Sequence, residues 1–396
     1  MSCAEEIVLN VLALNKAFKG YELFHAYLGP RRLRERAARI PVARARGALE
    51  ELLEGLDAAA IPDEAPDYRR TYYRDYLHCV LAQLDTFVFR RRRPFPETLA
   101  SLMASPVPRP FRLQADLAPL KAELRRAGFR SIHEYRKARA PVRFQRRAQL
   151  ADYVYEIVDE VTTQLTRRGA PPFPGGLRRL LARSRLRVVI PRPDEPPCFY
   201  RYDGDYRGTL GVALDRDFSA PVVRAFVLHE VIPGHHLYYM LKQDQIDRGD
   251  ADALVGADTF YSPENPVNEG LAVCADMSFG PMLDPMTHLG VQVEKFLHRV
   301  VYNAWHQVNV GRSRTDARLL RLLREEVGFK EAEIRQKLAY HTRSARYYTP
   351  VYPVGIVAVE RTAPLLGPDR LFLLYRQHSA NTLRKLRERH ATHRTQ

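Results

Sequence analysis

Apolar residues recur every three to four positions through most of the first 168 residues, which is the spacing of helices with one buried face. The first such run ends at Gly29–Pro30, where glycine and proline stop a helix. The third run carries many aromatic residues on its inner face. The pattern predicts helices over residues 5–29, 42–61, 68–89, 96–103, 113–129 and 144–168.

The pattern changes at Gly169, where GAPPFPGG has the composition of a linker or turn. LRVVIPRP predicts a short strand, and CFYRYDGDYRGTLGVAL predicts two strands joined by a turn at Asp203–Gly204. Helix resumes at Pro221, because proline is favoured in a first helical turn. The predicted fold class is therefore mainly α with a small antiparallel β element. The later helices are predicted over 222–247, 264–279, 285–311, 314–327, 330–345 and 368–393.

The helix predicted at 222–247 contains FVLHEVIPGHHLYYM, an apolar stretch with four polar residues: His229, Glu230, His235 and His236. Imidazoles and carboxylates that converge on one point are zinc ligands, so this cluster predicts a divalent metal site. In the familiar HExxH pattern the two histidines are four residues apart on one helix face. Here that position is Pro233, and Pro233–Gly234 predicts a break that swings His235 onto the face of His229. His236 is the alternative ligand, or a group that contacts a ligand or the substrate.

A third ligand is expected on a neighbouring helix, and NEGLAVCAD supplies Glu269 where the helix at 264–279 begins. Asp276 lies seven positions later, so it could orient a histidine ligand. Glu230 follows the first histidine directly and is placed to deprotonate a metal-bound water. The competing interpretation is that these groups satisfy buried polar demands without a metal.

HEVIPGHHL followed by NEGLAVCAD resembles the bacterial family named domain of unknown function 885, whose members carry an HExxPGHH motif and an EGWALYAE-like segment. That family resembles the gluzincin metallopeptidases, which use two histidines and a glutamate as ligands and a glutamate base. The late histidine also resembles the HExxxH motif of tubulin tyrosine carboxypeptidases, which favours His235 over His236. The resemblance implies a multi-helix gluzincin-like metallohydrolase fold. It also implies zinc, or else manganese or iron, bound by His229, His235 and Glu269.

The resemblance covers residues 190–375 and is weak in the N-terminal half. RVVYNAWHQV resembles the family's RLVVDTGLH helix and implies a role for His306, although Tyr302 stands where the family has an acidic residue. RYYTPVYPVG resembles its RY…YxxG segment and places Tyr352 there, with Arg343 or Arg346 as the arginine.

The predicted reaction is carboxypeptidase-like hydrolysis of a peptide or amide bond in a small peptide or amino-acid-derived substrate. Glu230 would be the base, and Tyr352 and His306 would donate to the oxyanion. Arg343 or Arg346 would bind a substrate carboxylate. The alternative is a metal-dependent biosynthetic enzyme of specialised metabolism, acting on a small amino-acid-derived compound with non-peptidase chemistry.

The chain is expected to form one continuous structural unit with two regions. Residues 1–168 would be an N-terminal helical region covering the active site, and residues 169–396 the catalytic metal-binding region. The edge of the predicted hairpin could pair with an extended peptide, or the hairpin could simply cover the helices.

The net charge is +16, with basic clusters at 31–46, 90–93 and 178–187. No nucleic-acid-reading motif accompanies them, so arginine-rich solvated helix faces are the expected explanation. A basic nucleic-acid-binding protein with a relic site is the remaining alternative. The chain has no long apolar run, no signal-peptide pattern and four scattered cysteines, which together predict a cytoplasmic protein with no membrane span. The sequence is silent on oligomeric state.

Overall fold

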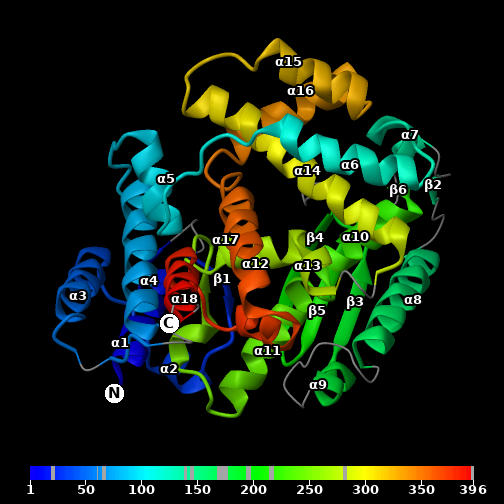
Figure 1. Cartoon of the computed structure of the whole chain (residues 1–396). Coiled ribbons are helices and arrows are strands. Elements are labelled where there is room, and N and C mark those ends of the chain that lie inside the picture. Colours follow the sequence, from blue (N-terminus) through cyan, green and yellow to red (C-terminus); the bar gives the residue numbers. More distant parts are fainter. Residues whose placement is uncertain are drawn as a thin grey trace.

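The chain is mainly helical, with three small sheets in the part that the structure describes. The computed structural model describes residues 1–18, 23–59, 61–64, 68–137, 141–142, 147–166, 177–192, 198–213, 218–279 and 283–393. Within these residues, no helix combines the length and apolar character needed to cross a bilayer. Figure 1 shows helices α12 (Asn265–Val273) and α17 (Val351–Leu366) in the middle of the molecule, between the largest sheet and the N-terminal helices.

The N-terminal helices pack around a hydrophobic cluster to which α1, α3 and α4 contribute, together with Ala253, Leu254 and Ala257 from later in the chain. A capping box begins α1: the Ser2 hydroxyl accepts from the Glu5 N–H, and the Glu5 carboxylate accepts from the Ser2 N–H. The elements of this region are α1 (Cys3–Ala17), β1 (Phe24–Tyr27), α2 (Arg31–Arg36), α3 (Val42–Gly55), α4 (Arg69–Gln83), the π-helical turn η1 (Leu84–Val88) and α5 (Phe95–Met103).

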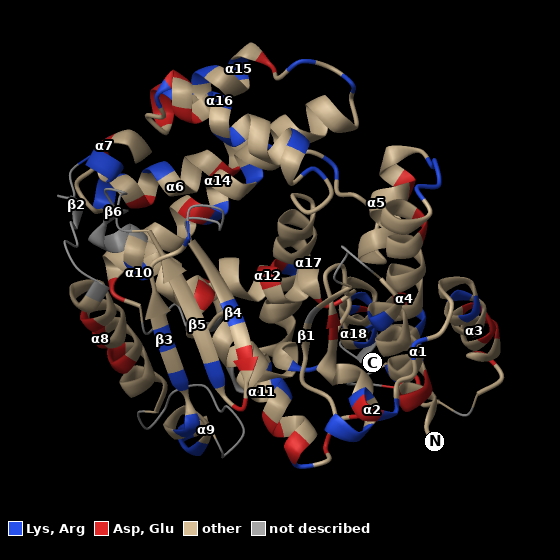
Figure 2. Cartoon of the chain, turned by 180° about the vertical axis from the view of Figure 1, so that it is seen from behind, with Lys and Arg blue, Asp and Glu red and all other residues tan. Residues whose placement is uncertain are grey.

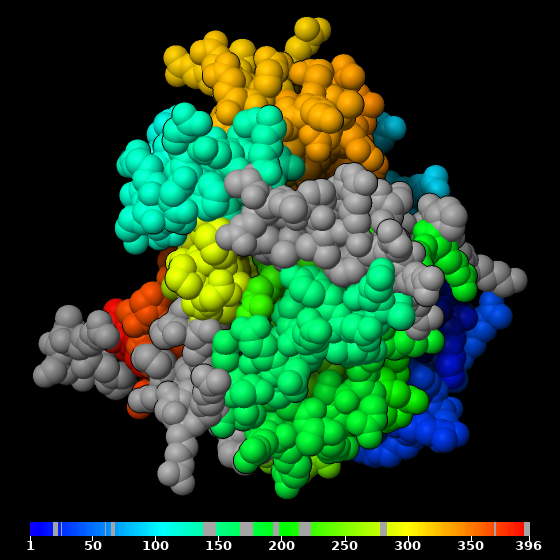
Figure 3. Space-filling model, turned by 90° about the vertical axis from the view of Figure 1, so that its right-hand side faces the viewer, coloured from blue at the N-terminus to red at the C-terminus, as the bar shows by residue number. Residues whose placement is uncertain are grey.

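The next elements form the outer side of the molecule that Figure 3 shows, with α6 and α7 above α8. Helices α6 and α7 share a hydrophobic cluster with α14, to which Leu124, Tyr135 and Phe296 belong. Helix α8 packs against strand β3 of the largest sheet. These elements are α6 (Leu113–Arg126), α7 (Ile132–Lys137), β2 (Pro141–Val142), α8 (Arg147–Thr166) and α9 (Leu177–Arg183).

The largest sheet has three strands in the order β3-β5-β4: β3 (Arg185–Val189), β4 (Cys198–Gly204) and β5 (Arg207–Val212). Strand β5 runs parallel to β3 and antiparallel to β4, so β4 is an edge strand. Asp205 and Tyr206 join β4 to β5 with left-handed backbone φ of 50° and 63°, as a two-residue hairpin turn requires. The two other sheets pair β1 with β7 (Ala257–Thr259) and β2 with β6 (Phe218–Ser219).

The remaining helices carry the candidate site. Helices α12 and α17 touch at the backbone, because both have a glycine at the contact. A methyl group on Gly355 would lie 1.7 Å from the carbonyl oxygen of Pro266, and one on Gly270 would lie 2.4 Å from the carbonyl carbon of Gly355. The other elements are α10 (Ala220–Glu230), α11 (His235–Asp247), the 3₁₀ turn η2 (Ala253–Gly256), α13 (Ala275–Phe279), α14 (Pro285–Asn309), α15 (Ala317–Arg321), η4 (Leu322–Glu326), α16 (Glu331–Ala339), η5 (Tyr340–Ser344), η6 (Pro368–Tyr375) and α18 (Ala380–His393).

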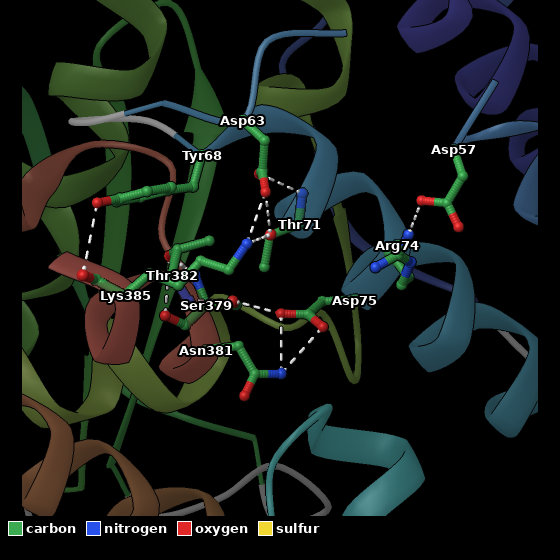
Figure 4. Close-up of polar contacts among 10 residues, drawn as sticks. All are labelled: Asp57, Asp63, Tyr68, Thr71, Arg74, Asp75, Ser379, Asn381, Thr382 and Lys385. Carbon is green, nitrogen blue, oxygen red and sulfur yellow. Dashed lines mark hydrogen bonds and ion pairs between the residues drawn. The ribbon is translucent and has the colours of Figure 1, made fainter. Parts of the chain in front are cut away.

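Helix α18 packs on α4, so segments from the two ends of the chain meet. The Ser379 hydroxyl and the Asn381 amide donate to the Asp75 carboxylate, and the Lys385 ammonium donates to Asp63 at 2.6 Å (Figure 4). All five hydrophobic clusters of the described residues likewise combine residues from both sides of position 168. The N-terminal region is therefore packed against the rest of the chain.

The predicted strand at LRVVIPRP, the two strands of the hairpin and most predicted helices are present, with corrections. The hairpin turn lies at Asp205–Tyr206, because the predicted turn residues Asp203 and Gly204 belong to β4. The predicted helices 264–279 and 368–393 are each interrupted, into α12 and α13 and into η6 and α18. Residues 24–27 are a strand instead of a helix, because they pair with β7. The β element is mixed instead of antiparallel, because β3 runs parallel to β5. The segment 222–247 forms two helices, and helix α17 had no predicted counterpart. The predicted linker GAPPFPGG lies outside the described residues.

The positive charge is distributed over the fold. Figure 2 shows Lys and Arg on elements throughout the molecule, interspersed with Asp and Glu. Several of these arginines are paired: Arg299 bonds both Asp116 and Glu360, and Asp85 accepts from both Arg46 and Arg93.

Candidate metal centre

The chain turns sharply between the two histidines of the predicted site. Helix α10 ends at Glu230, and α11 begins at His235 after a short loop. Gly234 is required there, because a side-chain carbon at this position would lie 1.6 Å from the carbonyl oxygen of His229. The turn brings the rings of His229 and His235 to a centroid distance of 4.9 Å, nearly perpendicular at 89°.

Glu269 on α12 completes a group of three candidate ligands. Its Oε2 lies 3.4 Å from Nε2 of His229 and 3.6 Å from Nε2 of His235. One ligand atom from each of the three residues lies within 4.8 Å of the others. Oε2 of Glu269 is buried and makes no contact of hydrogen-bonding geometry with any described residue, which is rare for a buried carboxylate oxygen. Two imidazoles and a carboxylate with an oxygen left unsatisfied fit a divalent metal.

Two neighbours that the sequence did not single out hold these ligands in place. Oδ1 of Asn268 lies 3.0 Å from Nδ1 of His235 and can only accept, so Nδ1 carries a proton and Nε2 is the nitrogen that faces Glu269. The Tyr348 hydroxyl donates to Oε1 of Glu269 at 2.7 Å. Asp276, predicted to orient a histidine, instead accepts from Lys295 at 3.0 Å and from Gln292 at 2.7 Å.

His236 points away from this centre. The Ser184 hydroxyl lies 2.8 Å from its Nε2 and the Tyr200 hydroxyl 2.7 Å from its Nδ1. The ring is fully buried, and burial lowers its pKa to about 4. Both ring nitrogens are engaged, so in this structure His236 serves as neither the alternative ligand nor the substrate contact that the sequence suggested. It ties α11 to β4 and to the start of β3.

The centre concentrates negative charge around two imidazoles. Burial lowers the pKa of His235, but the Glu269 carboxylate more than reverses this and raises that pKa to about 9. Burial raises the pKa of Glu269, but His235 and His229 hold it well below its ordinary range. Burial also raises the pKa of Glu230, against the opposing effect of both histidines. Oε2 of Glu230 lies 4.0 Å from Nε2 of His235, at the edge of the three-residue group.

Two cavities meet at the centre, where His229, Glu230 and Tyr352 line both. The smaller has a volume of about 250 Å³ and the larger about 430 Å³. Tyr352 is thus beside the centre, as the sequence predicted, and its ring stacks on His298 with a centroid distance of 4.5 Å. Burial raises the pKa of Tyr352 well above its ordinary value, so its phenol stays protonated.

His298 was given no role from the sequence, yet it lines the smaller cavity. Burial lowers its pKa to about 3, with a smaller contribution from His229, so the ring is neutral at pH 7. The sequence did contain one indication of such a role: His298 lies on the predicted helix 285–311, two helical turns before His306, the histidine that the resemblance favoured.

Besides His236, three predicted site residues are absent from the described linings of both cavities. His306 packs beside Tyr302 and Trp305, with ring centroids 6.0 and 6.3 Å away. Arg343 and Arg346 are exposed, and the Arg346 guanidinium donates to the Tyr347 hydroxyl at 3.1 Å. The described linings contain no Lys or Arg, so neither predicted arginine is brought to the cavities in this structure.

Comparisons with known proteins give a likeness of fold. No family model matches the chain, and no curated protein matches it. A solved structure of a candidate lipoprotein from Colwellia psychrerythraea aligns with a TM-score of 0.50 and 15% identity, over 92% of this chain and 65% of that one. A candidate lipoprotein of unknown function from Shewanella oneidensis aligns with a TM-score of 0.48 and 14% identity, over 87% and 71%. The chain therefore spans less than two thirds of the Colwellia protein.

Proposed function

We propose that the chain is a metal-dependent hydrolase that cleaves a peptide or amide bond in a small peptide or amino-acid-derived substrate. The observation that carries the proposal is the unsatisfied Oε2 of Glu269, which faces Nε2 of both His229 and His235. Zinc is the metal that best suits this ligand set, and manganese or iron would also be accepted. The resemblance of HEVIPGHHL and NEGLAVCAD to domain of unknown function 885 supports the same proposal.

The chain's own residues suit the two halves of such a reaction. A divalent ion held here would lower the pKa of a bound water and polarise the substrate carbonyl. Glu230 is the base in this proposal, because it borders the ligand group and burial raises the pKa of its carboxyl. It would take the water proton and pass it to the leaving amine. Tyr352, kept protonated, would donate to the developing oxyanion.

The substrate's backbone has a candidate docking strand. Strand β4 is at the sheet edge, and its first residue, Cys198, lines both cavities, while Phe199 and Tyr200 line the larger. An extended peptide beside β4 would thus pass the candidate metal centre. The proposed substrate is not bound through its terminal carboxylate, as in a carboxypeptidase, because neither described lining offers a cation for that group.

The test is metal analysis combined with activity on a panel of small peptides and N-acyl amino-acid amides. We expect one bound divalent ion per chain, lost in His229→Ala, and chelator-sensitive cleavage. Glu230→Gln should keep the ion and lose activity by roughly 100-fold or more. Glu325→Gln, an exposed carboxylate, is the matched control. A chain without bound metal would overturn the proposal. A metal-loaded chain that cleaves nothing would instead favour the biosynthetic alternative.

A further inference from the structure

The smaller cavity has an apolar wall and the size of a single side chain. Its volume of about 250 Å³ equals roughly eight waters in the liquid. His229, Glu230 and Tyr352 are part of its lining, so whatever fills it lies beside the candidate metal centre. The apolar wall comes mainly from Val212, Val223, Phe226, Ala272, Val273 and Val291.

One further charged group lines this cavity. Glu294 of α14 is partly buried, and among the described residues it has no hydrogen bond and no ion pair. Arg136 feels its charge at a distance, but that guanidinium donates to the Val327 carbonyl and lies over the Phe329 ring. Glu294 thus places a carboxylate with no described partner beside a largely apolar wall. The described lining holds no Lys or Arg to supply one.

The position of Glu294 sets the length of the group that could reach it. Glu294 precedes His298 by one helical turn, about 6 Å along α14, and the two residues share a helix face with Val291. His298 in turn stacks on Tyr352 beside the centre. A ligand would therefore present apolar atoms to the wall and a cation to the carboxylate, one turn away from the reacting groups. Lysine and arginine side chains combine an apolar stem with a charged head in this way.

We propose that this cavity is a specificity pocket for a lysine or arginine side chain next to the bond that is cleaved, with Glu294 as its recognition residue. The inference rests on the proposed hydrolase function for the direction of the substrate, while the pocket's charge and shape stand independently of it. A norleucine side chain would contact the same apolar wall but would leave the Glu294 carboxylate without a cation. A glutamate side chain would meet two carboxylates, Glu294 and Glu230, and be repelled.

The test compares short peptides of one sequence that carry lysine, norleucine or glutamate at a single position. For the metal-loaded chain we expect kcat/KM to favour lysine over norleucine by roughly 10- to 100-fold, the range of a charge-assisted hydrogen bond. Glu294→Gln, which keeps the shape of the side chain, should reduce this ratio to about threefold or less, and Glu294→Lys should turn the preference towards glutamate. Glu325→Gln should keep the lysine preference. Equal ratios in the wild type and in Glu294→Gln would overturn the pocket.

A binding experiment separates failure of the pocket from failure of the hydrolase proposal. Calorimetry with metal-loaded Glu230→Gln and the same peptides needs no turnover. Lysine-preferring binding without any cleavage would keep the pocket and remove the hydrolase proposal. Cleavage with no lysine preference would keep the hydrolase proposal and remove the pocket. Equal Kd values for the lysine and norleucine peptides would overturn the pocket whatever the activity, and thermal melts would establish that each variant is folded.

Discussion

The hydroxyl of Tyr348 donates to Oε1 of Glu269 at 2.7 Å and leaves Oε2 of the same carboxylate facing His229 and His235. One phenol thus decides which oxygen is available to a metal. Such supporting hydrogen bonds typically change metal affinity by about 10- to 100-fold.

Tyr348→Phe is therefore expected to weaken metal binding by about 10- to 100-fold without abolishing it. A competition titration against a chromophoric chelator measures the change. Tyr347→Phe is the matched control, since that hydroxyl accepts from Arg346 and does not contact Glu269. Equal metal affinities for the two variants would contradict the role given to Tyr348.

Substitutions of the two adjacent histidines, His235 and His236, should have different effects. His235→Gln is expected to lose the bound ion. His236→Gln should keep the ion and lower the free energy of unfolding by about 1–3 kcal/mol, because the buried partners Ser184 and Tyr200 lose their hydrogen-bonding ring. Metal analysis and urea unfolding report on the two effects separately. Loss of metal in His236→Gln alone would reverse the assignment of the ligand.

Gly355→Ala should destabilise the protein by about 1–3 kcal/mol or more, because the added methyl would overlap the Pro266 carbonyl. It should also weaken metal binding, since α12 carries both Pro266 and Glu269. Gly47→Ala is the control: nothing lies within 4 Å of a methyl group there, and alanine favours the helix by roughly 0.5–1 kcal/mol. Thermal melts and chelator competition would measure both quantities. A Gly355→Ala chain as stable as the wild type would show that the helices can separate at no cost.

Asp75 should make stability depend on pH. Burial raises its pKa from 3.8 to about 6, against the hydrogen bonds from Ser379 and Asn381 and the charges of Arg74 and Lys385. Because the folded pKa is the higher one, this contribution to stability is complete below pH 3.8 and is lost as pH rises through 6. The full loss is at most about 3 kcal/mol.

Asp75→Asn should flatten that part of the pH dependence, which urea unfolding between pH 4 and pH 7 would reveal as a smaller slope than in the wild type. Asp57→Asn is the control (Figure 4), because the Asp57 side chain is 75% exposed and pairs with Arg74 at the surface. An unchanged slope in Asp75→Asn would mean that another group carries the titration.

Patterns that arise within one element were predictable from the sequence. Helix α1 and strand β4 each bury one face, so their apolar spacing is visible along the chain. Strand β1 was not predictable, because its conformation comes from pairing with β7, more than 200 residues later. Helix α17 was missed because it is buried on nearly all sides and has no polar face to give a period.

The ligand group was predictable for a similar reason. His229, Glu230 and His235 lie within seven residues, and Glu269 follows in a recognisable segment. Asn268, Tyr348 and His298 act through contacts between different helices, which no spacing along one helix reveals. The assignment of His306 and of the two arginines rested on resemblance, and the fold directs those side chains elsewhere.

The contact between α4 and α18 also affects the order in which parts of the fold can form while the chain is being synthesised. Asp75 and its partners Ser379 and Asn381 are 304 and 306 positions apart. At ribosomal rates of about 5–20 residues per second, α4 would wait roughly 15–60 s for α18 to emerge. During that time Asp75 faces water and can remain ionised. The N-terminal helices can therefore form early, but their last polar contacts await nearly the whole chain.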